Sequence, residues 1–111
     1  MARGAEAESQ VAEALIADGW CLLARNWRGA RGELDVVAER AGVLRFVEVK
    51  LRDPDDPLSD ESVNASKRDR LRSAARLWLS ERGDPVGDAC FLVAIVGTGG
   101  SIQWIDNAFD G

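Results

Sequence analysis

The sequence contains no histidine, the side chain most often used as a general base and a frequent metal ligand. Its absence excludes Ser-His-Asp triads, Cys-His pairs and histidine metal clusters. An enzyme with this sequence must therefore work with Asp, Glu, Lys, Arg, Ser or water. The two cysteines, Cys21 and Cys90, form no CxxC motif and lie in apolar runs. We expect buried free thiols there, not a disulfide or a zinc site.

Long apolar runs are also missing. No run approaches the roughly 20 residues of a membrane span. The N-terminal MARGAEAESQ lacks the apolar core of a signal peptide, which predicts a cytoplasmic protein with no membrane partner. A chain of 111 residues, 46% hydrophobic and 30% charged, predicts one globular domain over residues 1–111.

Positive charge is scarce overall but concentrated locally. The formal net charge of -5 disfavours a polyanionic partner for the molecule as a whole. Residues 25–52 nevertheless hold seven Arg or Lys against four acids, and residues 67–76 hold five against one. Residues 53–61 carry five acids and no base. A nucleic-acid-binding face is thus compatible with this sequence only if it is local.

Hydrophobic periodicity and turn residues predict an α/β fold of order αβββαββ. The predicted helices cover residues 5–18 and 64–82, and the predicted strands cover residues 20–27, 33–40, 43–52, 90–97 and 101–106. The segment 53–62, rich in proline and acids, is expected to form a mobile loop.

The strongest signal is the hairpin GELDVVAERAGVLRFVEVKLR, residues 32–52, which carries charges where apolar residues are expected. A two-residue connection at Ala41-Gly42 would pair Arg40 with Val43. Counting back along both strands, Asp35 then lies opposite Glu48. Directly opposed residues share a face, with Cβ atoms roughly 5 Å apart. The hairpin register therefore predicts a pair of neighbouring carboxylates.

Two partly desolvated carboxylates repel each other unless something compensates their charge. A divalent cation does so well, because Mg²⁺ takes oxygen ligands from one or two carboxylates, waters and a substrate phosphate. The carbonyl of Val49 is a further candidate ligand. Lys50 shares the face of Glu48 and could contact phosphate or position a water. This set predicts a site for metal-assisted phosphodiester hydrolysis.

A third carboxylate comes from the first predicted helix. Glu8 precedes Val11, Ala12 and Leu15 by three, four and seven residues, so it lies on the same inward stripe. We expect Glu8 at the edge of the core, while Glu6 and Glu13 point elsewhere.

The run RNWRGARGELDVVAERAGVLRFVEVKLR resembles the signature of the YraN family of endonuclease-like proteins. The resemblance extends from the AEAESQVAEAL helix to the closing NAF and is strongest in GELD, FVEVK and R-N-W. It implies a restriction-endonuclease-like three-layer core, with a mixed sheet flanked by helices. This is the Holliday-junction-resolvase-like variant of the PD-(D/E)xK nuclease fold.

The resemblance also implies a nuclease site that depends on Mg²⁺, or on Mn²⁺ in its place. Asp35 and Glu48 would be metal ligands, Lys50 the catalytic lysine and Glu8 an accessory acid. Lys67 matches a lysine that commonly opens the second helix of the family. The expected partner is DNA, perhaps branched or nicked, and relatives of the resolvase type often act as homodimers. The residues expected to contact nucleic acid are Arg28, Arg31, Arg52, Lys67 and Arg68.

The sequence departs from the family pattern in two places. Ala7 stands where a glycine usually precedes the glutamate of helix one. The fourth strand usually reads R-F-D-V, whereas this chain has Cys90-Phe91-Leu92-Val93. Neither departure touches Asp35, Glu48 or Lys50.

Simpler interpretations exist for each of these residues. Asp35, Glu48 and Lys50 could form a solvated strand face with cross-strand ion pairs, such as Glu33 with Lys50. Lys67 could be a helix-edge lysine with its stem on the core. Three functions therefore stay open: a metal-dependent nuclease, an inactive nucleic-acid-binding module on the same fold, and a protein-interaction domain.

Overall fold

A computed structural model describes residues 2–30, 32–51, 65–83 and 88–106, apart from the side chains of residues 2–5, 65–68, 98 and 106. The elements are α1 (Ala2–Ala17), β1 (Cys21–Gly29), β2 (Gly32–Arg40), β3 (Val43–Leu51), α2 (Ala65–Arg82), β4 (Asp88–Val96), the short 3-10 helix η2 (Thr98–Gly100) and β5 (Ile102–Asp106). The predicted order αβββαββ is confirmed. The acidic loop predicted at 53–62 lies outside the described residues.

The five strands form one mixed sheet in the order β1-β2-β3-β4-β5. Strands β1, β2 and β3 form an antiparallel meander, β4 runs parallel to β3, and β5 is antiparallel to β4. The parallel step from β3 to β4 contains α2, as a crossover connection requires. The predicted α/β class is thereby confirmed.

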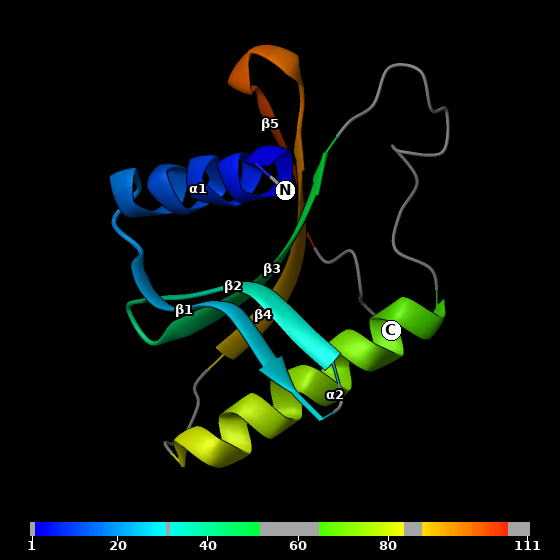
Figure 1. The fold of residues 1–111 in the computed structure, drawn as a ribbon. Coiled ribbons are helices and arrows are strands. Elements are labelled where there is room, and N and C mark those ends of the chain that lie inside the picture. The colour runs from blue at the N-terminus through cyan, green and yellow to red at the C-terminus, as the bar shows by residue number, and fades with distance from the viewer. Residues whose placement is uncertain (1, 31, 52–64, 84–87, 107–111) are drawn as a thin grey trace.

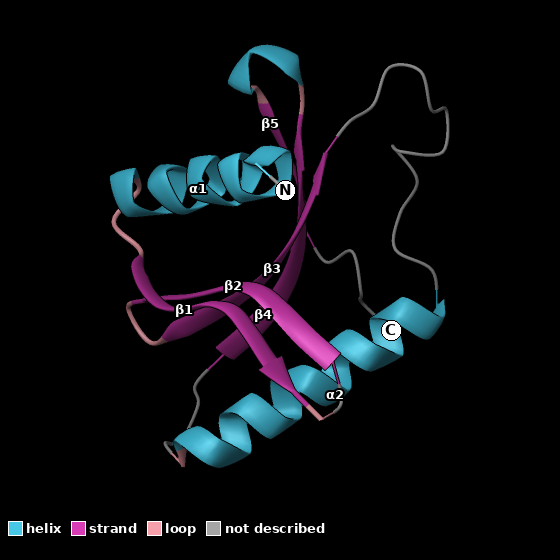
Figure 2. Cartoon of the chain, in the orientation of Figure 1, coloured by secondary structure: helices cyan, strands magenta, loops and turns pink. Residues whose placement is uncertain are grey.

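Each face of the sheet is covered by one helix, so the molecule has three layers (Figures 1 and 2). The apolar stripe of α1 packs on one face through Val11 and Leu15. Leu71, Ala74 and Trp78 of α2 pack on the other face. All five side chains are buried, as their spacing predicts.

The β2–β3 hairpin has the predicted register. Arg40 pairs with Val43 across the Ala41-Gly42 turn, and the ladder continues to Val36 and Val47. Ala41 and Gly42 both have positive φ, 51° and 84°, which matches the geometry of a tight two-residue hairpin turn.

The ladder between β2 and β3 ends one step before the carboxylate pair. The predicted pairs Asp35–Glu48 and Glu33–Lys50 are absent from the ladder, so the prediction of direct strand pairing at these positions is wrong. Beyond this point β2 stays paired with β1 as far as Gly32, and β3 stays paired with β4 as far as Leu51. The two strands therefore diverge like a fork, which Figure 1 shows between the labels β2 and β3.

The side-chain alternation of β2 also changes at the fork. Leu34 and Val37 pack in the cluster on the α2 side, whereas Val36 and Ala38 pack in the cluster on the α1 side. In a regular strand Leu34 and Val36 would share a face. An irregularity at Asp35 therefore accompanies the end of the ladder.

The cysteines and tryptophans differ in burial. Cys21 and Cys90 are free, as predicted, but Cys21 is exposed and Cys90 is only half-buried, so the expected burial is wrong. Cys21 opens β1, which is an edge strand of the sheet that the described residues form. Trp20 and Trp78 are buried, and Trp104 on the edge strand β5 is 36% exposed.

No helix within the described part of the chain could cross a membrane.

Candidate functional site

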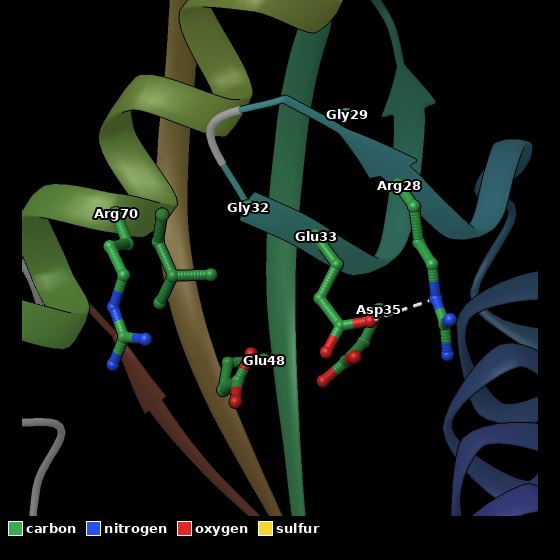
Figure 3. A pocket seen from close by; sticks show the side chains of 8 residues that line it. Arg28, Gly29, Gly32, Glu33, Asp35, Glu48 and Arg70 are labelled. Atoms are coloured by element: carbon green, nitrogen blue, oxygen red, sulfur yellow. Dashed lines mark ion pairs between the residues drawn. The ribbon is translucent and has the colours of Figure 1, made fainter.

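A pocket of about 570 Å³ opens at the fork between β2 and β3 (Figure 3). Its walls come from the end of β1, the start of β2, the middle of β3 and the first turns of α2. The lining residues are Arg28, Gly29, Gly32, Glu33, Asp35, Glu48, Arg70 and Leu71. The end of the β2–β3 ladder thus leaves a space that charged side chains line.

Asp35 and Glu48, the two predicted metal ligands, both line this pocket. Glu48 is 8% exposed and is the one charged side chain buried within the described residues. Asp35 is half-buried, and its Oδ2 accepts a 2.9 Å hydrogen bond from the backbone N–H of Val49. The structure therefore brings the two carboxylates to one pocket without pairing their strands.

The hydrogen bond from Val49 also bears on its carbonyl group. In a strand the N–H and C=O of one residue point to the same side, as the exchange of both bonds between paired residues requires. Since the N–H of Val49 points to Asp35, the carbonyl of Val49 faces the β2 side too. The predicted third oxygen ligand therefore lies on the same side of β3 as the Asp35 carboxylate.

Lys50 follows Glu48 by two residues in a regular strand, so its side chain leaves the same face of β3. It is half-buried and is not among the residues that line the pocket. Strand periodicity is thus the observation that places Lys50 beside the pocket.

Glu8 of α1 lies within electrostatic reach of Asp35. Burial and the charge of Asp35 raise the pKa of Glu8 above its ordinary value, and Glu33 adds a smaller increase. A hydrogen bond from the side chain of Asn26 and the charge of Arg25 oppose this rise. Helix α1 thus adds a third carboxylate next to the fork, although Glu8 does not line the pocket.

Asn26 is a site residue that the sequence interpretation missed. It has a positive φ of 52°, a backbone conformation that Asn tolerates better than most residues. Its amide donates to Glu8, while the neighbouring Arg25 donates to Oγ of Ser9 at 3.2 Å. The R-N-W string therefore ties β1 to α1 beside Asp35. An asparagine within a strand pattern was the available signal, because Asn is depleted in regular strands.

Arg28 is the one predicted nucleic-acid contact whose side chain the structure describes. It is exposed, lines the pocket, and forms a 3.2 Å ion pair with Glu33. Glu33 pairs with Arg28 across β1 and β2, not with Lys50 as the simpler interpretation supposed. Arg31 and Arg52 lie outside the described residues, as do the side chains of Lys67 and Arg68. Contacts through these residues stay predictions.

The donor set is compatible with a magnesium site but is small. Within the described ranges, no group of three or more His, Cys, Asp or Glu side chains is placed to hold one ion. Mg²⁺ is usually held by only one or two carboxylates, and waters and phosphate complete its shell. Asp35, Glu48 and the carbonyl of Val49 satisfy that requirement by chemistry.

The departures in β4 have a structural consequence. Leu92 is 1% exposed and pairs with Val47 in the parallel ladder, on the α1 side of the sheet. The position at which the resemblance to YraN proteins implies an aspartate is thus part of the apolar core in this chain. It lies on the face opposite to the one that carries Phe46 and Glu48.

Comparison with known proteins identifies the family. The model of the uncharacterised protein family UPF0102 matches residues 7–96. A UPF0102 protein of Gloeobacter violaceus is 42% identical over 114 residues, covering 96% of this chain and 90% of that protein. One from Synechococcus is 44% identical over 96 residues, covering 84% and 73%. One from Helicobacter pylori is 32% identical over 106 residues, covering 96% and 90%. The match covers most of α1, the hairpin, the fork and all of α2, and the chain belongs to the UPF0102 family, as its resemblance to YraN proteins predicts.

Proposed function

We propose that this protein is a metal-dependent nuclease that hydrolyses phosphodiester bonds of DNA, with branched or nicked forms as candidate substrates. The observation that carries the proposal is the convergence of Asp35 and Glu48 on one pocket at the strand fork. The αβββαββ order, the mixed sheet and one helix on each face support a restriction-endonuclease-like core.

Asp35, Glu48 and the carbonyl of Val49 would hold the Mg²⁺ or Mn²⁺ ion. When bound, such an ion supplies Lewis acidity toward the phosphate and its attacking water. The bond from the N–H of Val49 fixes one oxygen of Asp35 and so orients this carboxylate. The burial of Glu48 removes competing water from the second carboxylate.

Lys50 and Glu8 have supporting roles in this proposal. The ammonium group of Lys50 contacts the phosphate or positions the attacking water from the same strand face as Glu48. Glu8 has a raised pKa beside Asp35, so its carboxyl can hold a proton closer to neutral pH than an exposed glutamate can.

A cleavage panel tests the proposal. Linear, nicked, flapped and four-way DNA would be incubated with Mg²⁺ or Mn²⁺, and calorimetry would measure metal binding in parallel. We expect cleavage by the wild type and its loss in Asp35→Asn, Glu48→Gln and Lys50→Ala. We expect metal binding to weaken in the first two variants. Glu13→Gln is the matched control, because Glu13 is an exposed carboxylate on α1 away from the pocket. Cleavage that persists in Asp35→Asn and Glu48→Gln would overturn the assignment.

A second function has one observation in its favour. Cys90 and Leu92 replace the arginine and aspartate that the family usually carries, and Leu92 is buried in the core. An inactive module that binds nucleic acid or protein on the same fold fits this replacement. If the protein binds metal and DNA but cleaves no substrate in the panel, it is an inactive nucleic-acid-binding module. The absence of both kinds of binding would leave protein interaction.

A further inference from the structure

Arg70 lines the pocket from the side opposite to the β2 carboxylates. It lies on α2, whereas Glu33 and Asp35 come from β2. In Figure 3 the guanidinium of Arg70 is on one side of the pocket, Glu33 and Asp35 are on the other, and Glu48 lies between them in the view. Arg70 therefore borders the same pocket as the three carboxylates, from a different element.

The two arginines of the pocket differ in their surroundings. The guanidinium of Arg28 is already paired with Glu33 at 3.2 Å. Arg70 is exposed, and within the described residues it has no ion pair. Arg70 therefore supplies the lining with a positive charge that no described carboxylate neutralises.

The charge of the lining predicts when an anion can bind. Among the described residues of the lining there are three carboxylates, of Glu33, Asp35 and Glu48, and two guanidinium groups, so this described part has a formal charge of -1. A divalent cation on Asp35 and Glu48 would make it positive. Phosphate binding next to Arg70 should then depend on the metal.

The position of Arg70 is fixed by a close contact between backbones. A Cβ atom added to Gly32 would lie 3.2 Å from the carbonyl oxygen of Arg70 and 3.6 Å from Cβ of Ala74. The start of β2 therefore packs directly on the turn of α2 that carries Arg70. This contact sets the separation between the guanidinium-bearing helix and the carboxylates of β2.

We propose that Arg70 binds a backbone phosphate of the DNA strand that occupies this pocket, across from the metal-binding carboxylates. The inference rests on the proposed function for the identity of the polymer. Guanidinium suits this role because its planar N–H groups can donate two parallel hydrogen bonds to a phosphate. Arg70 is a substrate-binding residue in this proposal, and no proton transfer is assigned to it.

Equilibrium binding tests the proposal without cleavage. Fluorescence anisotropy would measure the affinity of the full chain for labelled nicked and single-stranded DNA. Ca²⁺ would replace Mg²⁺ in these titrations, each repeated over a range of salt concentrations. Arg70→Ala should bind DNA roughly tenfold more weakly than the wild type. A tenfold loss is at the low end of the range for losing a hydrogen bond to a charged group, as suits an exposed side chain. For the nicked duplex, a plot of log affinity against log salt concentration should become shallower by about 0.9 in Arg70→Ala. This is the change expected when one phosphate is no longer neutralised.

The control variant is Arg76→Ala, because Arg76 is exposed on the same helix but does not line the pocket. It should leave affinity and salt slope near the wild-type values. Arg70→Lys should recover part of the affinity and the full salt slope, since the charge is kept and the paired geometry is lost. Melting temperatures would show that all three variants are folded.

The outcomes separate this inference from the proposed nuclease activity. An unchanged salt slope in Arg70→Ala, or equal losses in Arg70→Ala and Arg76→Ala, would overturn the role of Arg70 while cleavage stands. If the wild type cleaves no DNA but Arg70→Ala alone loses DNA affinity, the role of Arg70 is supported and the proposed nuclease activity is contradicted. No salt-dependent DNA binding by the wild type would overturn the inference outright.

Discussion

The backbone N–H of Val49 donates a 2.9 Å hydrogen bond to Oδ2 of Asp35. The bond forms just past Val36–Val47, the last pair of the β2–β3 ladder. The carboxylate of Asp35 thus takes the place of the backbone carbonyl that would accept this hydrogen bond if β2 and β3 stayed paired. The N–H of Val49 therefore keeps a hydrogen-bond partner at the fork. The same bond links one candidate metal ligand to the strand that carries Glu48 and Lys50.

We predict that Asp35→Ala destabilises the fold more than Asp35→Asn does. Both variants remove the charge, but only Asn keeps an oxygen that can accept from Val49. The loss of the acceptor leaves a partly buried N–H unpaired, at a cost of about 1 kcal/mol or more. Urea denaturation of both variants measures the difference. Equal free energies of unfolding would mean that the Val49 bond adds no stability.

We predict that Glu8→Gln changes the dependence of stability on pH. The folded state raises the pKa of Glu8, so it binds the proton more tightly than the unfolded chain does. Stability due to this group is therefore present at acid pH and is lost as pH rises through the window between the unfolded and the raised pKa. Glutamine at position 8 cannot ionise. The melting temperature of Glu8→Gln should therefore rise relative to that of the wild type as the pH increases through this window.

Thermal melts of both proteins between about pH 4 and pH 7 measure this difference. Glu13→Gln, from the exposed side of α1, should run parallel to the wild type over the same range. A constant gap between Glu8→Gln and the wild type at every pH would contradict a raised pKa of Glu8 in the folded state.

We predict that Gly32→Ala destabilises the protein by about 1–3 kcal/mol and weakens DNA binding. Gly32 has a φ of 147°, and an added Cβ would press on the carbonyl of Arg70 at 3.2 Å. Gly42→Ala is the comparison, because Gly42 also has a positive φ, 84°, but a Cβ there meets no atom within 4 Å. Gly42→Ala should lose stability by strain alone and keep DNA affinity, as anisotropy would measure. Equal effects on affinity would contradict a spacing role for Gly32.

We predict that Ala41→Asn stabilises the hairpin by about 0.5–1 kcal/mol. Ala41 has a positive φ of 51° and is exposed, and Asn-Gly suits such a turn better than Ala-Gly. Ala30→Asn, at an exposed turn position that does not have a positive φ, should give no comparable gain. Denaturation midpoints compare the two variants, and an unchanged midpoint for Ala41→Asn would contradict the prediction.

The sequence predicted the elements and the hairpin register because both depend on local patterns. Turn residues at Ala41-Gly42 and a period of two along each strand fix which residues are opposed. The same rule failed at Asp35, because register counting assumes that two strands stay paired. Continued pairing of β2 with β1 and of β3 with β4 separates them there, and this depends on the whole sheet.

The candidate site was predictable in part for the same reason. Asp35 and Glu48 belong to one hairpin, and Glu8 follows from the apolar stripe of α1. Arg70 did not follow from any such pattern, because its place at the pocket depends on how α2 packs against Gly32. Asn26 was missed because strand periodicity does not foresee a residue with a positive φ inside β1.

The fork between β2 and β3 also bears on the order in which the site assembles during folding. Asp35 and Glu48 stand on two arms of one hairpin that a two-residue turn closes. Such hairpins form within about 1–10 μs, before distant helices need to dock. We therefore expect the two like charges to approach each other before α2 brings Arg70 to them. We expect a divalent ion to speed this early step, so that the ligand proposed for the finished site would also assist its formation.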